Sequence, residues 1–281
     1  MSLPSVAPVV LQKFRQNEPI ETHDLLAVEE PMEIRIGFGP EKARSQQRLV
    51  VTMRTPGHDF ELALGFLYAE GIIQHPADVL SVGYCQDAGR QERGNLVRVE
   101  LAPAVTLDTT RLQRNFYASA SCGVCGKAAI ESVYDAQCPS LASHPLRIDR
   151  RIISTLPDRL LGKQAVFACT GGLHAAGLFD VQGNLLLMRE DVGRHNALDK
   201  LIGAAWYGGA ISLSDSIALM SGRIGFELVQ KCLKAGIPLL AAVGAPSSLA
   251  VSLARSADMT LIGFVRDGGF NVYAGHERLE V

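Results

Sequence analysis

The chain has 281 residues, of which 47% are hydrophobic and 20% are charged, a composition typical of soluble globular proteins. Its 27 Lys and Arg residues nearly balance 29 Asp and Glu residues, so no overall positive field favours nucleic-acid binding. The longest apolar run, residues 237–245, has about half the length of a membrane-spanning helix, and residues 1–10 lack the features of a signal peptide. We expect a cytoplasmic protein of one large or two modest domains, without nucleic-acid or membrane partners.

The N-terminal part of the sequence predicts a flexible arm followed by a smaller α+β domain. Residues 1–20 contain prolines, show no clear hydrophobic period and carry mixed charge, which favours the arm. Residues 21–115 form the expected domain, with a largely antiparallel sheet and an apolar helix that starts after Pro56 and ends at Gly71. Alternating or β-branched residues predict its strands at 33–38, 48–54, 79–85 and 95–101.

Residues 116–281 predict a larger α/β domain that begins with a Cys-x-x-Cys loop. Strand-like and helix-like runs alternate in it, which is the pattern of a parallel or mixed sheet covered by helices. The expected strands are 165–170, 176–180, 185–188, 217–220, 237–243 and 259–265, and the expected helices are 194–206, 224–235 and 248–256.

Two of the six cysteines stand apart, because Cys122 and Cys125 are separated by two residues in a loop rich in Ser and Gly. A zinc site would need further ligands, and no second Cys-x-x-Cys or closely spaced His pair supplies them. The other interpretations are a thiol redox pair before a helix, a thiolate that carries a group such as sulfane sulfur between partners, and two buried thiols. The remaining cysteines are expected to be small buried residues: Cys85, Cys138, Cys169 and Cys232.

Three loops are expected to follow strands that end at the same edge of the larger sheet. They are Ser221-Gly222-Arg223, residues 244–248 and residues 266–269. In open α/β sheets, loops at the carboxyl ends of strands line the ligand crevice, and helix N-termini there bind anions. The sequence therefore predicts a phosphate-bearing ligand, although it contains neither the P-loop nor the dinucleotide-binding glycine pattern.

Further polar residues surround these loops in the sequence. His174 follows a pair of glycines, and Arg194 and His195 begin a predicted helix on which His195 and Asp199 share a face. These side chains form a functional cluster, or alternatively Asp191 caps a helix whose first charges are solvated and His174 is a turn or core histidine. The residues by themselves leave both interpretations open.

A series of motifs runs through most of the chain in a fixed order. The motifs are Ala63-Leu64-Gly65-Phe66 with Glu70-Gly71-Ile72-Ile73, Cys122-Gly123-Val124-Cys125-Gly126, Thr170-Gly171-Gly172-Leu173-His174-Ala175-Ala176, Glu190-Asp191-Val192-Gly193-Arg194-His195-Asn196-Ala197-Leu198-Asp199-Lys200, Ser221-Gly222-Arg223 with Glu227 and Val229-Gln230-Lys231, and Leu261-Ile262-Gly263-Phe264. In this order they resemble the FdhD family of formate dehydrogenase accessory sulfurtransferases.

The resemblance implies a sulfur-transfer function. A member of this family takes sulfur from a cysteine desulfurase as a cysteine persulfide and passes it to the cofactor of formate dehydrogenase. That cofactor is Mo-bis(molybdopterin guanine dinucleotide) or its tungsten counterpart, bound as a substrate. Cys122 matches the persulfide cysteine, and Cys125 is its partner in the motif. The alternatives are a non-catalytic cofactor-binding chaperone and a thiol-disulfide oxidoreductase.

The resemblance also implies a cofactor site, a fold and an oligomer. The family's cofactor-contacting stretch falls on Phe264, Val265, Arg266, Asp267, Gly268 and Gly269. To this stretch we add Arg194, His195, Ser221, Arg223 and His174 from the loops, and we expect GDP or a related guanine nucleotide to bind there. The larger domain should have a three-layer, cytidine-deaminase-like fold, and a homodimer is expected. The loop at 119–126 should lie near this crevice or reach it by moving.

Overall fold

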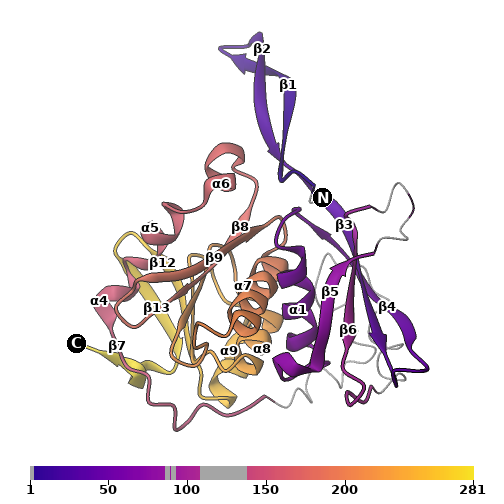
Figure 1. The fold of residues 1–281 in the computed structure, drawn as a ribbon. Helices are drawn as coiled ribbons and strands as arrows, with labels where there is room; N and C mark the ends of the chain where they lie inside the picture. The colour runs from indigo at the N-terminus through magenta and orange to yellow at the C-terminus, as the bar shows by residue number, and fades with distance from the viewer. Residues whose placement is uncertain (1–2, 86–88, 90–92, 108–137) are drawn as a thin grey trace.

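The computed structural model describes residues 3–85, 89, 93–107 and 138–281. In this part of the chain, an N-terminal hairpin leads into a small sheet with one helix, and a larger sheet covered by helices follows (Figure 1). None of the helices described is long and apolar enough to span a membrane. The expected domain boundary at 115–116 lies outside the described residues.

An antiparallel hairpin occupies most of the region where the sequence predicted a flexible arm. Strand β1 Val6–Arg15 pairs along its whole length with β2 Glu18–Ala27. Gln16 and Asn17 both have positive φ, 50° and 67°, as the tight turn between two twisted strands requires. The hairpin projects away from the rest of the molecule (Figure 1). This regular element differs from the arm expected over residues 1–20, because cross-strand pairing orders a segment whose own hydrophobic period is weak.

The small sheet and its helix enclose one hydrophobic core. The elements are β3 Glu30–Phe38, β4 Ser45–Arg54, α1 Asp59–Ala69, the 3₁₀ turn η1 Pro76–Asp78, β5 Val79–Tyr84 and β6 Leu96–Leu101. The strand order is β4-β3-β6-β5, with β3 and β6 parallel and the other neighbours antiparallel. Ile34, Ile36 and Val97 are fully buried and share a core with Leu62 and Leu67 of α1. The predicted strands and helix of this region are confirmed, with ends that shift by at most three residues.

The larger sheet is mixed, and its central strands are parallel. Its strands are β8 His174–Phe179, β9 Leu185–Asp191, β10 Ile217–Met220, β11 Leu239–Ala242, β12 Thr260–Arg266 and β13 Gly269–Ala274. Their order is β13-β12-β11-β10-β8-β9, in which β10, β11 and β12 run parallel and the outer pairings are antiparallel. The carboxyl ends of the parallel strands therefore lie at one edge, as predicted.

Helices cover both faces of this sheet and give three layers. One face is covered by α7 Arg194–Gly208, α8 Phe226–Lys234 and α9 Ser248–Ser256, and the other by α4 Arg150–Ile153 and α5 Leu156–Leu161. A short parallel pair, β7 Ile148–Asp149 with β14 Leu279–Glu280, and the 3₁₀ turn η3 His276–Arg278 complete this region. The mixed α/β class is thus confirmed, and the closer likeness to cytidine deaminases stays a prediction.

One predicted strand is a helix. Residues 165–170 form α6 Ala165–Thr170, and Gly171 ends it with a φ of 65°. The carboxylate of Glu190 accepts hydrogen bonds from the backbone N–H groups of Val166 and Phe167, at 3.2 and 2.8 Å, which satisfies the first turn of this helix. The prediction was wrong because an apolar run of six residues does not distinguish a strand from a short helix, and the capping carboxylate is distant in sequence.

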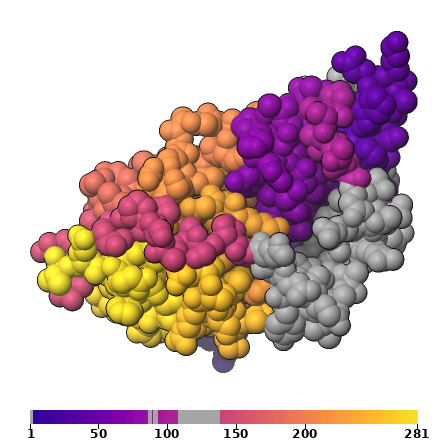
Figure 2. Space-filling model, turned by 90° about the horizontal axis from the view of Figure 1, so that it is seen from below, coloured from indigo at the N-terminus to yellow at the C-terminus, as the bar shows by residue number. Residues whose placement is uncertain are grey.

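The two sheets are joined by the packing of α1 against α7. These helices lie side by side (Figure 1), and the purple N-terminal part of the chain adjoins the orange part that contains α7 (Figure 2). The crossing is close because a glycine lies on each helix. A Cβ atom on Gly65 would lie 1.8 Å from the backbone oxygen of Asp199, and one on Gly203 would lie 2.0 Å from the backbone oxygen of Glu61.

We expect Gly203→Ala to destabilise the protein. Alanine increases helix propensity by about 1 kcal/mol, but its methyl group would overlap the Glu61 backbone and force the two helices apart, which typically costs about 1–3 kcal/mol and can cost more. Gly208→Ala in the same helix is the matched control, since a Cβ there meets no atom of the described residues within 4 Å. Chemical denaturation measures the free energy of unfolding of both variants. If both substitutions stabilised the protein equally, the close crossing of α1 and α7 would be contradicted.

Candidate functional site

The three predicted loops meet at one edge of the larger sheet. At the end of β10, the backbone N–H of Ser221 donates to the Ala175 oxygen at 2.9 Å, and Ser221 Oγ accepts from the Ala175 N–H at 2.8 Å. Gly244 N–H donates to the oxygen of Gly222 at 3.2 Å, and Phe264 N–H donates to the oxygen of Gly244 at 3.1 Å. These hydrogen bonds connect successive loops across the edge, which we call the site edge.

His174 lies at the site edge as the first residue of β8, where it pairs with Asp191 at the end of β9. A Cβ atom on Gly222 would come within 3.1 Å of His174 Nδ1, so the glycine leaves room for the imidazole. Burial lowers the pKa of His174, and the positive charge of Arg194 lowers it further. The imidazole is therefore neutral near pH 7 and offers one donor and one acceptor.

Arg194 and His195 begin α7 at the same edge. The N-cap residue, Gly193, provides no side chain to the first turn of the helix. Arg194 Nε and His195 Nε2 are both buried and have no hydrogen-bond partner among the described residues. Glu227 on α8 brings a carboxylate to His195, with its Oε2 3.7 Å from Nε2. A buried donor left without a partner costs about 1–3 kcal/mol, which makes both residues candidates for contacting a ligand.

Glu227 is a residue of this edge that the sequence did not assign a role. Burial works to raise the pKa of its carboxyl group, but the neighbouring imidazole of His195 and the charge of Arg194 outweigh that effect and lower the pKa. The ionised carboxylate sets the electrostatic environment of His195. The position of Glu227 in the first turn of a helix that follows the Ser221-Gly222-Arg223 loop could have suggested this role.

The stretch 264–269 forms the end of β12 and the turn into β13. Phe264 has a φ of 55° at an irregularity in the strand pairing, and the guanidinium of Arg266 lies 5.3 Å from the centre of its ring. Val265 is fully buried in the core beneath the sheet, so its side chain does not face the solvent. The exposed residues at this end are Arg266, Asp267, Gly268 and Gly269, together with Arg223 on the neighbouring loop.

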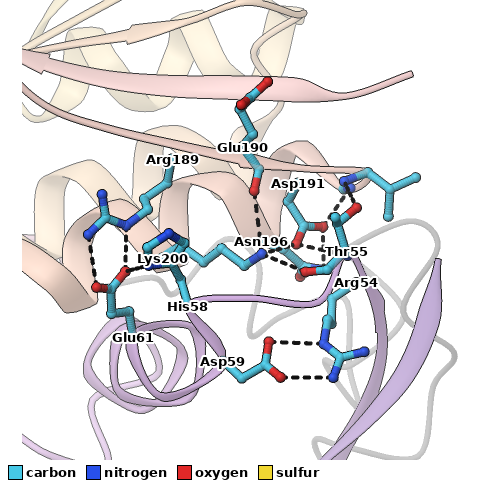
Figure 3. A network of polar contacts seen from close by, with 12 residues as sticks. Arg54, Thr55, His58, Asp59, Glu61, Arg189, Glu190, Asp191, Asn196 and Lys200 are labelled. Atoms are coloured by element: carbon cyan, nitrogen blue, oxygen red, sulfur yellow. Dashed lines mark hydrogen bonds and ion pairs between the residues drawn. The ribbon is translucent and has the colours of Figure 1, made fainter. Parts of the chain in front are cut away.

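The other polar residues around the start of α7 join the two sheets. Asp191 is fully buried and lies 2.7 Å from Lys200 Nζ, which also donates to the oxygen of Thr55 at 2.8 Å (Figure 3). Asn196 Nδ2 donates to the Met53 oxygen at 2.7 Å and to Asp191 Oδ1 at 3.1 Å. A solvated helix start would expose Lys200, but this side chain is buried, and Asp191 connects the segment after β4 to α7. Burial raises the pKa of Asp191, although Lys200 acts to lower it.

Further ion pairs strengthen the same junction. Asp199, expected to share a face with His195, forms a buried ion pair with Lys231 of α8 at 2.7 Å. Glu61 on α1 accepts hydrogen bonds from Arg189 on β9, one of them 2.8 Å long (Figure 3). Burial alone would raise the pKa of Glu61, but the hydrogen bonds from Arg189 and His58 lower it to about 2. These acidic residues therefore have structural roles.

Cys122 and Cys125, the expected sulfur-carrying pair, lie outside the described residues, as does the rest of the loop at 119–126. The structure thus brings together the predicted cofactor residues and does not place the thiols. Cys232 is fully buried, as expected for a small core residue. Cys169 on α6 differs from that expectation, because it is exposed. Cys85 and Cys138 are partly buried.

Known proteins resemble this chain over nearly its whole length. The sequence pattern of the FdhD/NarQ family matches residues 27–280. The chain is 48% identical over 261 residues to "Sulfur carrier protein FdhD" of Streptomyces coelicolor, covering 91% of this chain and 89% of the relative. It is 47% identical over 271 residues to the protein of the same name from Mycobacterium tuberculosis, covering 94% of each.

A solved structure shows the same fold. It is the crystal structure of a protein from Desulfotalea psychrophila described as a formate dehydrogenase accessory protein, with a TM-score of 0.74 and 23% sequence identity. The match covers 99% of this chain and all of the other. The family pattern and the relatives at 47–48% identity show that the chain belongs to the FdhD/NarQ family.

Proposed function

We propose that this protein is a sulfur carrier that serves a formate dehydrogenase. The observation that carries the proposal is the site edge, where Arg194 Nε and His195 Nε2 are buried without a partner among the described residues, beside three connected loops. Relatives named sulfur carrier proteins, at 47–48% identity, support the role. The similar fold of a protein described as a formate dehydrogenase accessory protein supports a formate dehydrogenase as the protein served.

The proposed sulfur transfer begins at Cys122, whose position in the motif supports this role. Its thiolate attacks the terminal sulfur of a persulfide on a cysteine desulfurase. The sulfur–sulfur bond of the donor breaks, the donor cysteine leaves as a thiolate, and Cys122 becomes the persulfide. Attack by the Cys125 thiolate on the Cys122 sulfur then releases hydrosulfide and leaves a disulfide between the two residues. A dithiol reductant restores both thiols.

The proposed acceptor is the metal of a bis(molybdopterin guanine dinucleotide) cofactor, bound as a substrate. The cofactor carries phosphate groups, and the site edge presents the guanidinium groups of Arg194, Arg223 and Arg266. In this proposal these residues hold the cofactor, and His195 orients it or transfers a proton.

Intact-mass measurement tests the sulfur-carrier proposal. After incubation with cysteine and a cysteine desulfurase, the protein should gain one sulfur atom that a reductant removes. A cofactor-binding chaperone would bind the cofactor and gain no sulfur. A thiol-disulfide oxidoreductase would show a reversible Cys122–Cys125 disulfide and no sulfur adduct, so either result would overturn the proposal.

We expect Arg194→Ala to weaken guanine-nucleotide binding. GDP should raise the melting temperature of the unmodified protein, because a ligand of the folded state stabilises it. Loss of a charge-assisted hydrogen bond, worth about 1.5–3 kcal/mol, should lower the affinity at least tenfold. Calorimetric titration measures this affinity. Arg150→Ala is the control, because Arg150 is an exposed arginine on α4, which is not part of the site edge. Equal affinities for all three proteins would remove Arg194 from the site.

We also propose that a second copy of the chain covers the β1–β2 hairpin. Val10, Phe14 and Leu26 are 56%, 65% and 51% exposed on it, and an isolated two-stranded hairpin is marginally stable in water. Val10 and Phe14 lie on the same face of β1, four residues apart. In a homodimer that pairs these hairpins around a two-fold axis, this face of each protomer would be buried against the same face of its partner.

Replacing Val10 and Phe14 together by Asp should therefore convert a dimer into a monomer. The dimer should dissociate because the new charges in the apolar contact would have to be desolvated. Sedimentation velocity measures the change in oligomeric state. Val272→Asp, at an exposed valine of β13, is the control. A monomeric unmodified protein, or a dimer that survives both Asp substitutions, would contradict the hairpin contact.

A further inference from the structure

A cavity of about 530 Å³ adjoins the site edge on the side of α5 and α6. It shares His174 and Ser221 with the site edge. Phe167 of α6 and the two glycines that follow this helix, Gly171 and Gly172, form one wall of the cavity. The position of α6 therefore determines how large the cavity is and how open His174 is from this side.

The helix α6 is weakly attached to the larger domain. None of its six residues is buried, so the burial of apolar surface contributes little to holding it in place. Within the described part of the chain, the element that α6 contacts most extensively is β2 of the hairpin, which lies at the same end of the molecule (Figure 1). An element with so few buried apolar contacts is expected to open locally at a small cost in free energy.

Glycines lie on both sides of α6. Gly162 ends α5 shortly before it, and Gly171 ends α6 with a φ of 65°. A Cβ atom on Gly171 would meet no atom of the described residues within 4 Å, and one on Gly172 would lie 3.5 Å from the Cβ of Ala27 on β2. Because glycine adopts more backbone conformations than any other residue, these positions can serve as hinges for α6.

One carboxylate holds the N-terminal end of α6 against the sheet. Glu190 of β9 accepts hydrogen bonds from the backbone N–H groups of Val166 and Phe167, at 3.2 and 2.8 Å. The N-cap position of α6 provides no side-chain hydrogen bond, so Glu190 takes the place of a cap. Hydrogen bonds to an ionised group are stronger than neutral ones. Glu190 pairs in register with Ala175, next to His174, so this contact begins at the site edge.

We propose that α6 is a movable wall of this cavity, that Glu190 holds the wall closed, and that its opening exposes His174. Because α6 also contacts β2, the hairpin and the site edge act on the same short helix. The inference rests on the proposed function only for the role of His174 as a ligand-contacting residue. The opening itself is measured without any ligand.

Two measurements on the full chain at pH 7 test the movable wall. Hydrogen exchange followed by mass spectrometry reports how often the amides of residues 165–170 open. Diethyl pyrocarbonate, which modifies neutral imidazoles, reports the accessibility of His174, whose pKa is lowered by burial and by the charge of Arg194. If α6 only capped the end of a neighbouring element, a change in its exchange would leave the modification of His174 unaltered.

Two substitutions should shift the wall in opposite directions. Glu190→Gln removes the charge and one of the two acceptor oxygens, so exchange of the α6 amides and modification of His174 should both become about tenfold faster. Gly172 has no positive φ. Gly172→Ala should restrict the open state and place a methyl group in contact with Ala27, so both rates should fall about two- to fivefold.

Matched controls separate this effect from a general change in stability. Glu41→Gln, at an exposed glutamate between β3 and β4, and Gly208→Ala on α7 should change neither rate. His276, whose side chain is 89% exposed, should be modified equally in all variants. Exchange of the amides of β10 should match that of the unmodified protein wherever the core is intact.

Modification of His174 that stays unchanged in Glu190→Gln while α6 exchanges faster would overturn the proposal. If Glu190→Gln fails to fold, slower exchange of α6 without slower modification of His174 in Gly172→Ala would overturn it as well. The proposed function is tested separately by adding GDP, which should slow the modification of His174 in the unmodified protein. Failure of GDP to do so would count against the proposed ligand site and leave the movable wall intact.

Discussion

Replacing Cys122 by Ser is expected to abolish the activation of formate dehydrogenase. Serine keeps the size of the side chain but cannot form a persulfide, because the hydroxyl of serine is not appreciably ionised near pH 7 and an oxygen cannot take the place of the carrier sulfur. The variant should gain no sulfur from a desulfurase, and activation should fall to the level measured without the protein. Its affinity for GDP should stay within about twofold of the unmodified protein, since binding depends on the site edge.

Two other cysteine variants complete this experiment. Cys169→Ser is the matched control, because Cys169 is exposed on α6 and donates only to backbone oxygens of its own helix within the described part of the chain. It should load sulfur and activate normally. Cys125→Ser should load sulfur but release it slowly, since attack by the second thiolate is lost. Activation that survives in Cys122→Ser, or loading that fails equally in Cys169→Ser, would refute Cys122 as the carrier.

Lys200→Met is expected to destabilise the protein strongly at neutral pH. Lys200 is 1% exposed and lies 2.7 Å from the fully buried carboxylate of Asp191. Methionine fills similar space but leaves that carboxylate without its countercharge, and breaking one side of a buried ion pair costs about 3–5 kcal/mol. Chemical denaturation at pH 7 measures the loss. Lys163→Met, at an exposed lysine after α5, should change stability by less than about 0.5 kcal/mol.

The pH dependence of this variant identifies Asp191 as the source of the loss. Burial raises the pKa of Asp191 even when Lys200 is present to lower it, so removal of Lys200 should raise the pKa further. A carboxyl group whose pKa is higher in the folded state stabilises the fold below its unfolded pKa, and this contribution disappears as the pH rises through the folded value. The difference in the free energy of unfolding between Lys200→Met and the unmodified protein should therefore become smaller as the pH is lowered from 7.

A second substitution provides the converse test. Asp191→Asn in the Lys200→Met background removes the unpaired charge and keeps one oxygen that can accept from the Gly193 N–H, although its NH2 group cannot accept from the Thr55 N–H. Part of the lost stability should therefore return at pH 7. A Lys200→Met protein that is as stable as the unmodified one at every pH would show that the ion pair does not hold the two sheets together.

The sequence predicted local elements wherever the hydrophobic pattern was long and regular. The strands of the small sheet and the helix that contains Leu62 and Leu67 were found where alternation and helical spacing placed them. The pattern failed over short segments. The six residues of α6 carry no decisive period, and the capping carboxylate of Glu190 follows 24 residues after Val166. The β1–β2 hairpin depends on cross-strand pairs, which a single segment does not display.

The sequence also determined which loops form the site edge, since parallel strands must end on the same side of a sheet. The sequence by itself could not separate ligand-binding from structural residues within one motif. Asp191 and Lys200 lie inward toward Thr55, more than 130 residues away, while Arg194 and His195 keep buried nitrogens without partners in the described structure at the edge. Only the tertiary structure decides this difference, because hydrogen bonding and burial depend on α1 and the end of β4, which pack against α7.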